Sequence, residues 1–232
     1  MSEGQREDDS KFHYTMNVGS IDNESKFWND FEDLGQKELL KMKITKIKVY
    51  TGLYQNKNAI FGISTTFRNF VTGETKEIVH KGSQDFIDVK EFVLQSGEYL
   101  TDFHIRLPEK NEYISQIGYC TKKRQFFVPE TTDDGEERRN IRKVEGNYII
   151  AGTFGCVNKK LDATGVLFVS MKDILEDSIL VFMMLKYKSK KDEKFKEDWD
   201  KKYKSLDIEY QYIWRFINLP NAVIPHIIKY LI

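Results

Sequence analysis

The chain has 232 residues, enough for one large or two small domains with a sizeable core. Lys and Arg together number 36, as do Asp and Glu, so the net charge is zero and no overall field directs the protein to nucleic acid or to an acidic membrane surface. Hydrophobic residues make up 40% and aromatic residues 13%, which is typical of a folded globular protein and excludes a disordered one.

Signals for export, membrane insertion and metal binding are absent from the sequence pattern. The N-terminal residues contain no apolar segment typical of a secretory signal, and the longest dense apolar run, Ile179–Leu185, is far too short to span a membrane. Cys120 and Cys156 are the two cysteines; their spacing matches no metal site, and a count of two does not establish a disulfide. We therefore expect a cytoplasmic protein with no metal, no cofactor and no bound nucleic acid.

The N-terminal part is predicted to be a polar tail that leads into the folded domain. Residues 1–26 are polar and show no periodicity, so we expect them to be flexible. Phe27 and Trp28 then supply large aromatic side chains, which predicts that packing on the core begins here. Leu34–Leu40 is expected to form a short helical turn.

From Met42 the sequence becomes strand-like, because apolar and polar residues alternate with a period of two. Met42 and Ile44 are one residue out of step with Ile47 and Val49, which predicts a β-bulge between the two pairs. About ten short strands with turn signals and no intervening helix favour an all-β sandwich, barrel or prism. The later strands are expected at Phe61–Phe67, Glu77–His80, Phe86–Leu94, Leu100–Leu107, Tyr113–Thr121, Gln125–Val128, Tyr148–Ala151 and Val166–Val169.

Two stretches between these strands are expected to be loops. Thr131–Lys143 is first acidic and then basic, which is typical of a surface loop. Gly152–Gly165 is punctuated by glycines and lies between two apolar runs, so it is predicted to expose backbone N–H groups beside one carboxylate, Asp162. Such a set of donors and one acceptor suits the hydroxyls of a neutral polyol. A tight hairpin without a binding role, in which Asp162 caps the turn, explains the same residues.

The character of the chain changes after Ser170. Ser170 and Asp173 have the spacing of a helix N-cap, and Ile179–Leu185 would either continue that helix or form a last strand. Apolar and aromatic residues at steps of three and four then predict a helix over about 192–217 with one apolar face. This face would either fold back on the β-domain or dock on a protein partner. It consists of Phe195, Trp199, Tyr203, Leu206, Tyr210, Ile213 and Ile217.

The stretch Gly152–Gly165 resembles the last hairpin of the jacalin-related lectins. That hairpin reads Gly-Phe-His-Gly, five further residues and Leu-Asp-Ala-Ile-Gly; here Gly152-Thr-Phe-Gly155 is followed by five residues and then by Leu161-Asp162-Ala-Thr-Gly165, without a gap. Further segments resemble the family in the same order, namely Trp28-Asn29-Asp30, Ile44–Tyr50, Ser96–Leu100 and Ile114–Lys122. The resemblance covers residues 27–170 and implies a mainly β fold, a jacalin-like β-prism of three small antiparallel sheets. An α-helical extension over 171–232 would follow it.

The resemblance also implies a sugar site. In the family, a Gly-x-x-x-Asp segment holds a hexose through backbone amides and the Asp side chain. The matching residues here are Asn158, Lys159, Lys160, Leu161 and Asp162, with Lys160 and Leu161 supplying the amides. Asn158 replaces the glycine and tolerates positive φ better than most residues. The family's Gly-Gly element has no counterpart near the start of this chain, and Lys159 or Lys160 replaces the aromatic residue that often stacks on the sugar.

Two functions follow from these observations. The first is a non-catalytic jacalin-like module that serves as an intracellular structural subunit of a larger assembly and docks through its C-terminal helices. The alternative is a lectin that recognises a neutral hexose, of the mannose or galactose type, at the loop formed by residues 155–162. An enzyme is not expected, because His13, His80, His104 and His226 are dispersed and belong to no catalytic or metal-binding motif.

Overall fold

A computed structural model describes residues 12–15, 18–70, 72–83, 85, 88–108, 113–130, 137–143, 148–171 and 173–174. In chain order the elements are β1 (Phe12–Tyr14), β2 (Val18–Gly19), β3 (Lys26–Asn29), α1 (Asp30–Leu34), α2 (Gln36–Leu39), β4 (Met42–Tyr54), β5 (Lys57–Asn69), β6 (Thr75–Lys81), β7 (Asp88–Val93), β8 (Leu100–Pro108), β9 (Gln116–Thr121), β10 (Gln125–Val128), β11 (Glu137–Lys143), β12 (Tyr148–Val157) and β13 (Leu161–Ser170).

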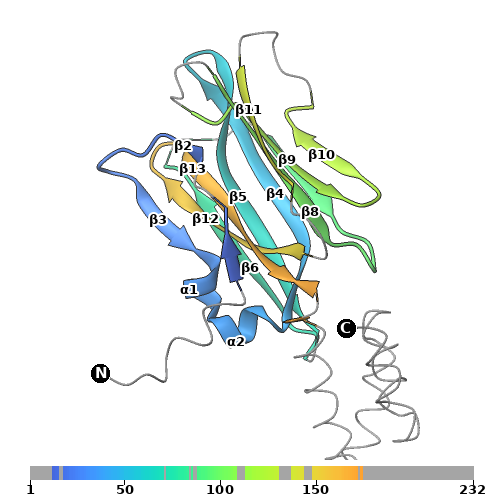
Figure 1. The fold of residues 1–232 in the computed structure, drawn as a ribbon. Coiled ribbons are helices and arrows are strands. Elements are labelled where there is room, and N and C mark those ends of the chain that lie inside the picture. Colours follow the sequence, from blue (N-terminus) through green and yellow to red (C-terminus); the bar gives the residue numbers. More distant parts are fainter. Residues whose placement is uncertain are drawn as a thin grey trace, which may run out of the picture.

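These strands form three antiparallel sheets (Figure 1). The first has the order β1-β13-β12-β3, with β2 also paired to β13; the second is β6-β5-β4-β7 and the third is β10-β9-β8-β11. The prediction of a mainly β fold with three small sheets is therefore confirmed. In the described part of the chain, neither helix approaches the length and apolar content needed to cross a membrane.

The core fills the space between the three sheets, and some strands contribute alternate apolar side chains to it. In β8, for example, Phe103, Ile105 and Leu107 are each at most 5% exposed, while the residues between them are partly exposed. Burying each such side chain contributes about 1.5–3 kcal/mol. The predicted alternation thus sets which face of β8 packs inward.

The predicted bulge in β4 is confirmed. Ile44 pairs with Phe67 and Lys46 pairs with Thr66, so β4 contains one extra residue at this point. The extra residue brings Ile44 and Ile47 onto the same inward side, where they are 4% and 0% exposed.

Part of the segment predicted to be a flexible tail belongs to the first sheet, which corrects that prediction. β1 and β2 both pair with β13, and Phe12 is 4% exposed with its ring 5.2 Å from that of Phe31. Because residues 1–26 are mostly polar, their sequence pattern did not indicate that the Phe12 side chain is buried.

The expected surface loop over Thr131–Lys143 also needs correction. Its second half is β11, which pairs along its length with β8. A charged sequence is compatible with a strand at the edge of a sheet, because charge on an edge strand prevents further pairing. The prediction of a loop, which was based on charged composition alone, is therefore wrong for β11.

The expected loop over Gly152–Gly165 is mostly strand, since β12 runs to Val157 and β13 begins at Leu161. The glycines serve packing rather than a turn. A Cβ atom on Gly155 would lie 2.7 Å from the Trp28 ring, and one on Gly165 would lie 2.5 Å from the Phe154 ring. Glycine is required at both positions because these rings cross the backbone closely.

At the end of β13 the predicted N-cap is confirmed. The backbone N–H of Asp173 donates to Ser170 Oγ (3.0 Å), and Ser170 Oγ donates to Asp173 Oδ2 (2.6 Å). The run Ile179–Leu185, the predicted helix over about 192–217 and its docking face lie outside the described residues.

Candidate functional site

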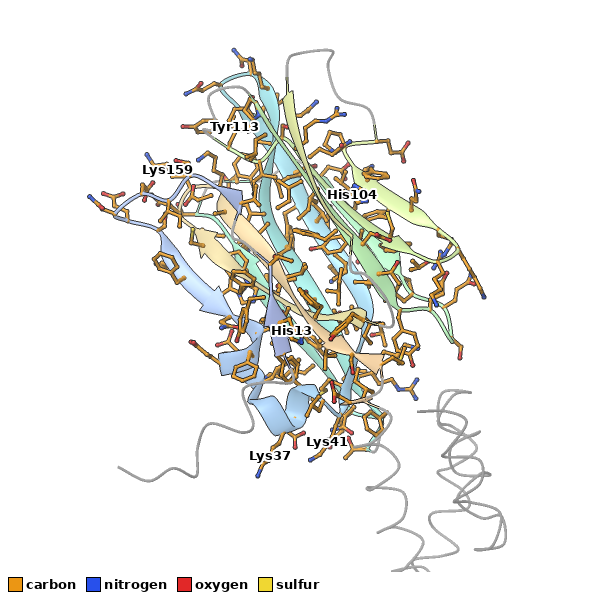
Figure 2. The ribbon with its side chains drawn as sticks, viewed as in Figure 1. His13, Lys37, Lys41, His104, Tyr113 and Lys159 are labelled. Atoms are coloured by element: carbon orange, nitrogen blue, oxygen red, sulfur yellow. The ribbon has the colours of Figure 1, made fainter. Side chains whose placement is uncertain are left out.

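The five residues predicted to bind sugar lie together where β12 turns into β13. The turn Asn158–Lys160 closes through a hydrogen bond from the Asn158 N–H to the Lys160 carbonyl (3.1 Å), and Ser83 N–H donates to the Asn158 carbonyl (2.8 Å). Figure 2 shows Lys159 at the end of the molecule opposite Lys37 and Lys41. The site is thus a short turn that is braced by the segment after β6.

Asp162, the predicted sugar ligand, is only 2% exposed and already has two partners. Its Oδ1 accepts a hydrogen bond from Lys160 Nζ (3.0 Å), and its Oδ2 accepts one from Ser25 Oγ (2.9 Å). The Lys160 side chain is 11% exposed, and its ammonium lies 5.0 Å from the centroid of the Tyr54 ring, a cation–π contact. Lys160 therefore turns inward and neutralises Asp162.

The turn also offers backbone donors. Among the described residues, no backbone acceptor outside the sheet ladders is found for the amides of Lys159 and Lys160. Gly82 lies against this peptide, because a Cβ atom there would come within 2.2 Å of the Lys159 carbonyl oxygen. Leu161 is fully buried at the start of β13, so its side chain belongs to the core. The turn therefore contains backbone N–H groups and is followed by one buried carboxylate, Asp162, that is bonded to Lys160 and Ser25.

A second segment of the site, residues 19–25, was missed by sequence reasoning. Gly19 pairs with Ala163, and the Ser20 N–H donates to the backbone carbonyl of Asp162 (3.1 Å). A Cβ atom on Gly19 would lie 2.0 Å from that same oxygen, so only glycine fits. This isolated glycine was the one available signal. Gly19 lies beside the backbone of Asp162 and is a single glycine, whereas the family has a Gly-Gly element near the start of its chain.

The loop after Gly19 joins the turn through polar side chains. The Asn158 amide donates to Asp22 Oδ2 (3.1 Å), and this hydrogen bond, together with one from the Glu24 N–H, lowers the pKa of Asp22. Next to it, burial raises the pKa of the Cys156 thiol, and the charge of Asp162 raises it further. Cys120 and Cys156 are both buried.

Comparison with known proteins identifies the family to which the sequence of this chain is similar. The family model named Jacalin-like lectin domain matches residues 22–167. A comparison with curated proteins finds no match. Several solved structures share the fold. Wild-type Malaysian banana lectin is 19% identical with a TM-score of 0.51, over 68% of this chain and 98% of that one.

Two further structures extend the comparison. AcmJRL, a mannose-binding jacalin-related lectin from Ananas comosus, is 14% identical with a TM-score of 0.51, over 68% of this chain and 98% of that one. Lamprey immune protein is 18% identical with a TM-score of 0.51, over 69% of this chain and 45% of that one. Identities this low show a shared fold alone. Because the family model spans more than half of the sequence, the chain belongs to the jacalin-like lectin domain family.

Proposed function

We propose that the chain is a non-catalytic lectin module that binds a neutral hexose at the turn Asn158–Lys160 and at Asp162. The observation that carries the proposal is that Asp162, the carboxylate that the family resemblance assigns to the sugar, lies within the matched family domain and directly follows the turn Asn158–Lys160 and Leu161. A sugar hydroxyl both donates and accepts, so it needs such a carboxylate and an amide together. Mannose is the first ligand to test, because AcmJRL is described as mannose-binding.

The sugar would have to replace a partner that Asp162 already has. A hexose hydroxyl that donates to Asp162 would take the place of Ser25 Oγ, which now donates at 2.9 Å, while Lys160 Nζ would keep its contact with Asp162 at 3.0 Å. Because each neutral hydrogen bond contributes only about 0.5–1.5 kcal/mol net, exchange of this kind gives a small gain. We expect a dissociation constant of about 1 mM for a monosaccharide, and multivalent glycans would bind more tightly.

An exposed aromatic side chain next to the site supports the proposal. Phe27 is 69% exposed and lies two residues beyond Ser25, which contacts Asp162. Hexoses have an apolar C–H face as well as hydroxyls, and an aromatic ring is the usual side chain that covers such a face. Phe27 would take this role in place of Lys159 and Lys160.

The test is a titration of the full-length chain with methyl α-mannoside and methyl α-galactoside, followed by amide NMR shifts and calorimetry. One sugar is expected to shift the amides of residues 158–162 and 20–25. Asp162→Asn is expected to abolish these shifts, and Phe27→Ala to weaken binding. Asp88→Asn, which alters an exposed carboxylate on β7, serves as the control. Absence of binding by the wild-type chain at tens of millimolar of either sugar would reject the proposal.

A second function, an interaction subunit without sugar binding, is favoured by one observation. Both oxygens of Asp162 are satisfied by the chain's own side chains, so the prism is complete without a ligand. The contact with a protein partner would then be made by the predicted apolar face between Phe195 and Ile217. The protein partner and the cytoplasmic location both stay predictions of the sequence.

Deletion of residues 190–232 distinguishes between an apolar face that docks on a protein partner and one that folds back on the β-domain. A face that docks on a partner predicts unchanged melting of the truncated chain and loss of a co-purifying protein. A face that folds back on the prism predicts a lower melting temperature and no lost partner.

A further inference from the structure

A second polar cluster lies where α1 packs against β12, away from the sugar site (Figure 1). Asp30, the first residue of α1, is completely buried. Its Oδ2 accepts hydrogen bonds from the Thr153 N–H (2.7 Å) and from Thr153 Oγ1 (2.9 Å). Gly152 makes room for this carboxylate, since a Cβ atom there would lie 3.1 Å from Asp30 Cβ. The fold thus holds one carboxylate rigidly inside the protein.

Two further ligand-type side chains face the same carboxylate. His80, from β6, places its Nε2 3.0 Å from Asp30 Oδ1, and its ring is stacked on Trp28 with the centroids 4.6 Å apart. Asp33 follows Asp30 by three residues on α1, which puts both on one side of the helix. One ligand atom from each of Asp30, Asp33 and His80 lies within 4.8 Å of the others.

Among the described residues, no ion pair joins Asp30 to a lysine or an arginine, and its Oδ1 faces His80 Nε2 instead. Buried carboxylates are normally paired or coordinate a metal ion. One further buried polar atom lacks a partner: the Tyr119 hydroxyl is fully buried and makes no hydrogen bond to the described residues. Burial raises the pKa of Tyr119, and the charge of Asp30 raises it further.

We propose that Asp30, Asp33 and His80 form a binding site for a divalent transition-metal ion, with Zn²⁺ as the best match. One imidazole nitrogen and two carboxylate oxygens form a ligand set that Zn²⁺ accepts, and a water molecule would complete a tetrahedron. Thr153 orients Asp30 and Trp28 orients His80, as the outer shell of a metal site does.

The geometry requires only small movements. Metal–ligand bonds of about 2.0–2.2 Å place neighbouring ligand atoms about 3.3 Å apart. Asp30 and His80, now 3.0 Å apart, would separate by a few tenths of an ångström. Asp33 is exposed, and its carboxylate oxygen, within 4.8 Å of the other two ligand atoms, would move closer to them. No local motif indicates this metal site, because Asp30 and His80 are 50 residues apart.

The test is a Zn²⁺ titration of the full-length, untagged chain by calorimetry and by thermal denaturation, with Co²⁺ absorption as a report on imidazole coordination. The wild-type chain is expected to bind about one Zn²⁺ at this site and to melt at a higher temperature when it is saturated. Asp33→Asn and His80→Asn are expected to weaken Zn²⁺ binding about tenfold or more. Glu32→Gln, an exposed acid on the same helix, and His13→Asn, on β1, are matched controls that keep wild-type binding.

Two results would overturn the proposal. One is a wild-type chain that neither releases heat with Zn²⁺ nor gains melting temperature, which would leave Asp30 and His80 as a simple hydrogen-bonded pair. The other is an equal Zn²⁺ response in all four variants, which would mean binding elsewhere. If His80→Asn fails to fold, Asp33→Asn decides the matter, because Asp33 is exposed and its replacement leaves the core intact.

Discussion

Lowering the pH is expected to reduce the free energy of unfolding through protonation of Glu98. This carboxylate is 2% exposed and is held by four hydrogen bonds. Arg124 binds it with both Nε (2.9 Å) and Nη2, the Gln95 N–H donates at 2.8 Å, and Thr121 Oγ1 donates at 3.4 Å. Arg124 is the largest cause that lowers the pKa of Glu98 from 4.5 to about 2. The pair ties the connection between β7 and β8 to the turn between β9 and β10.

The size of the effect follows from that pKa. A fall from 4.5 to about 2 corresponds to roughly 3 kcal/mol if the unfolded chain has the ordinary value. Because the Arg124 side chain is 37% exposed, solvent screens the pair, and we expect about 1–2 kcal/mol. The folded pKa is the lower one, so this stability is fully present above the unfolded pKa of about 4.5 and disappears as the pH falls through about 2.

The assay is urea denaturation of the wild-type chain and of Glu98→Gln between about pH 7 and about pH 2.5. Glu98→Gln is expected to be less stable by about 1–2 kcal/mol at neutral pH, and the difference is expected to shrink as the pH falls below 4.5. Glu91→Gln, whose side chain is 47% exposed, is the matched control and should follow the wild-type curve. A Glu98→Gln difference that stays constant over the whole pH range would refute the reasoning.

Three further predictions concern the site and its surroundings. Gly155→Ala is expected to lower the free energy of unfolding by about 1–3 kcal/mol, because its Cβ would lie 2.7 Å from the Trp28 ring; unchanged urea denaturation would contradict this. Lys160→Met is expected to cost about 2–4 kcal/mol by leaving Asp162 buried without its cation, and the double variant with Asp162→Asn should recover part of that loss; additive effects in the double-mutant cycle would argue against the pair. Cys156 is expected to resist iodoacetamide at about pH 8 until the chain unfolds, because burial raises the pKa of its thiol; rapid labelling of the native chain, seen by mass spectrometry, would count against it.

The sequence by itself determined the type of fold and several local features. Alternation with a period of two identified the inward side chains of β8 and the bulge in β4, because the side-chain period of a strand is fixed by its backbone. The spacing of Ser170 and Asp173 identified a helix cap, since capping is a contact between near neighbours. The order of the motifs around Gly152–Gly165 identified the family.

Only the tertiary structure decided what the key polar residues contact. Ser25 and Asp162 are 137 residues apart, and so no local pattern indicates that they share a hydrogen bond. Asp30 of α1 and His80 of β6 are 50 residues apart and meet for the same reason. The glycines of the last hairpin looked like turn residues, yet Gly155 and Gly165 make room for aromatic rings, and Trp28 comes from a distant segment. Local sequence records which side chains are buried, whereas the packing of distant segments decides what they are buried against.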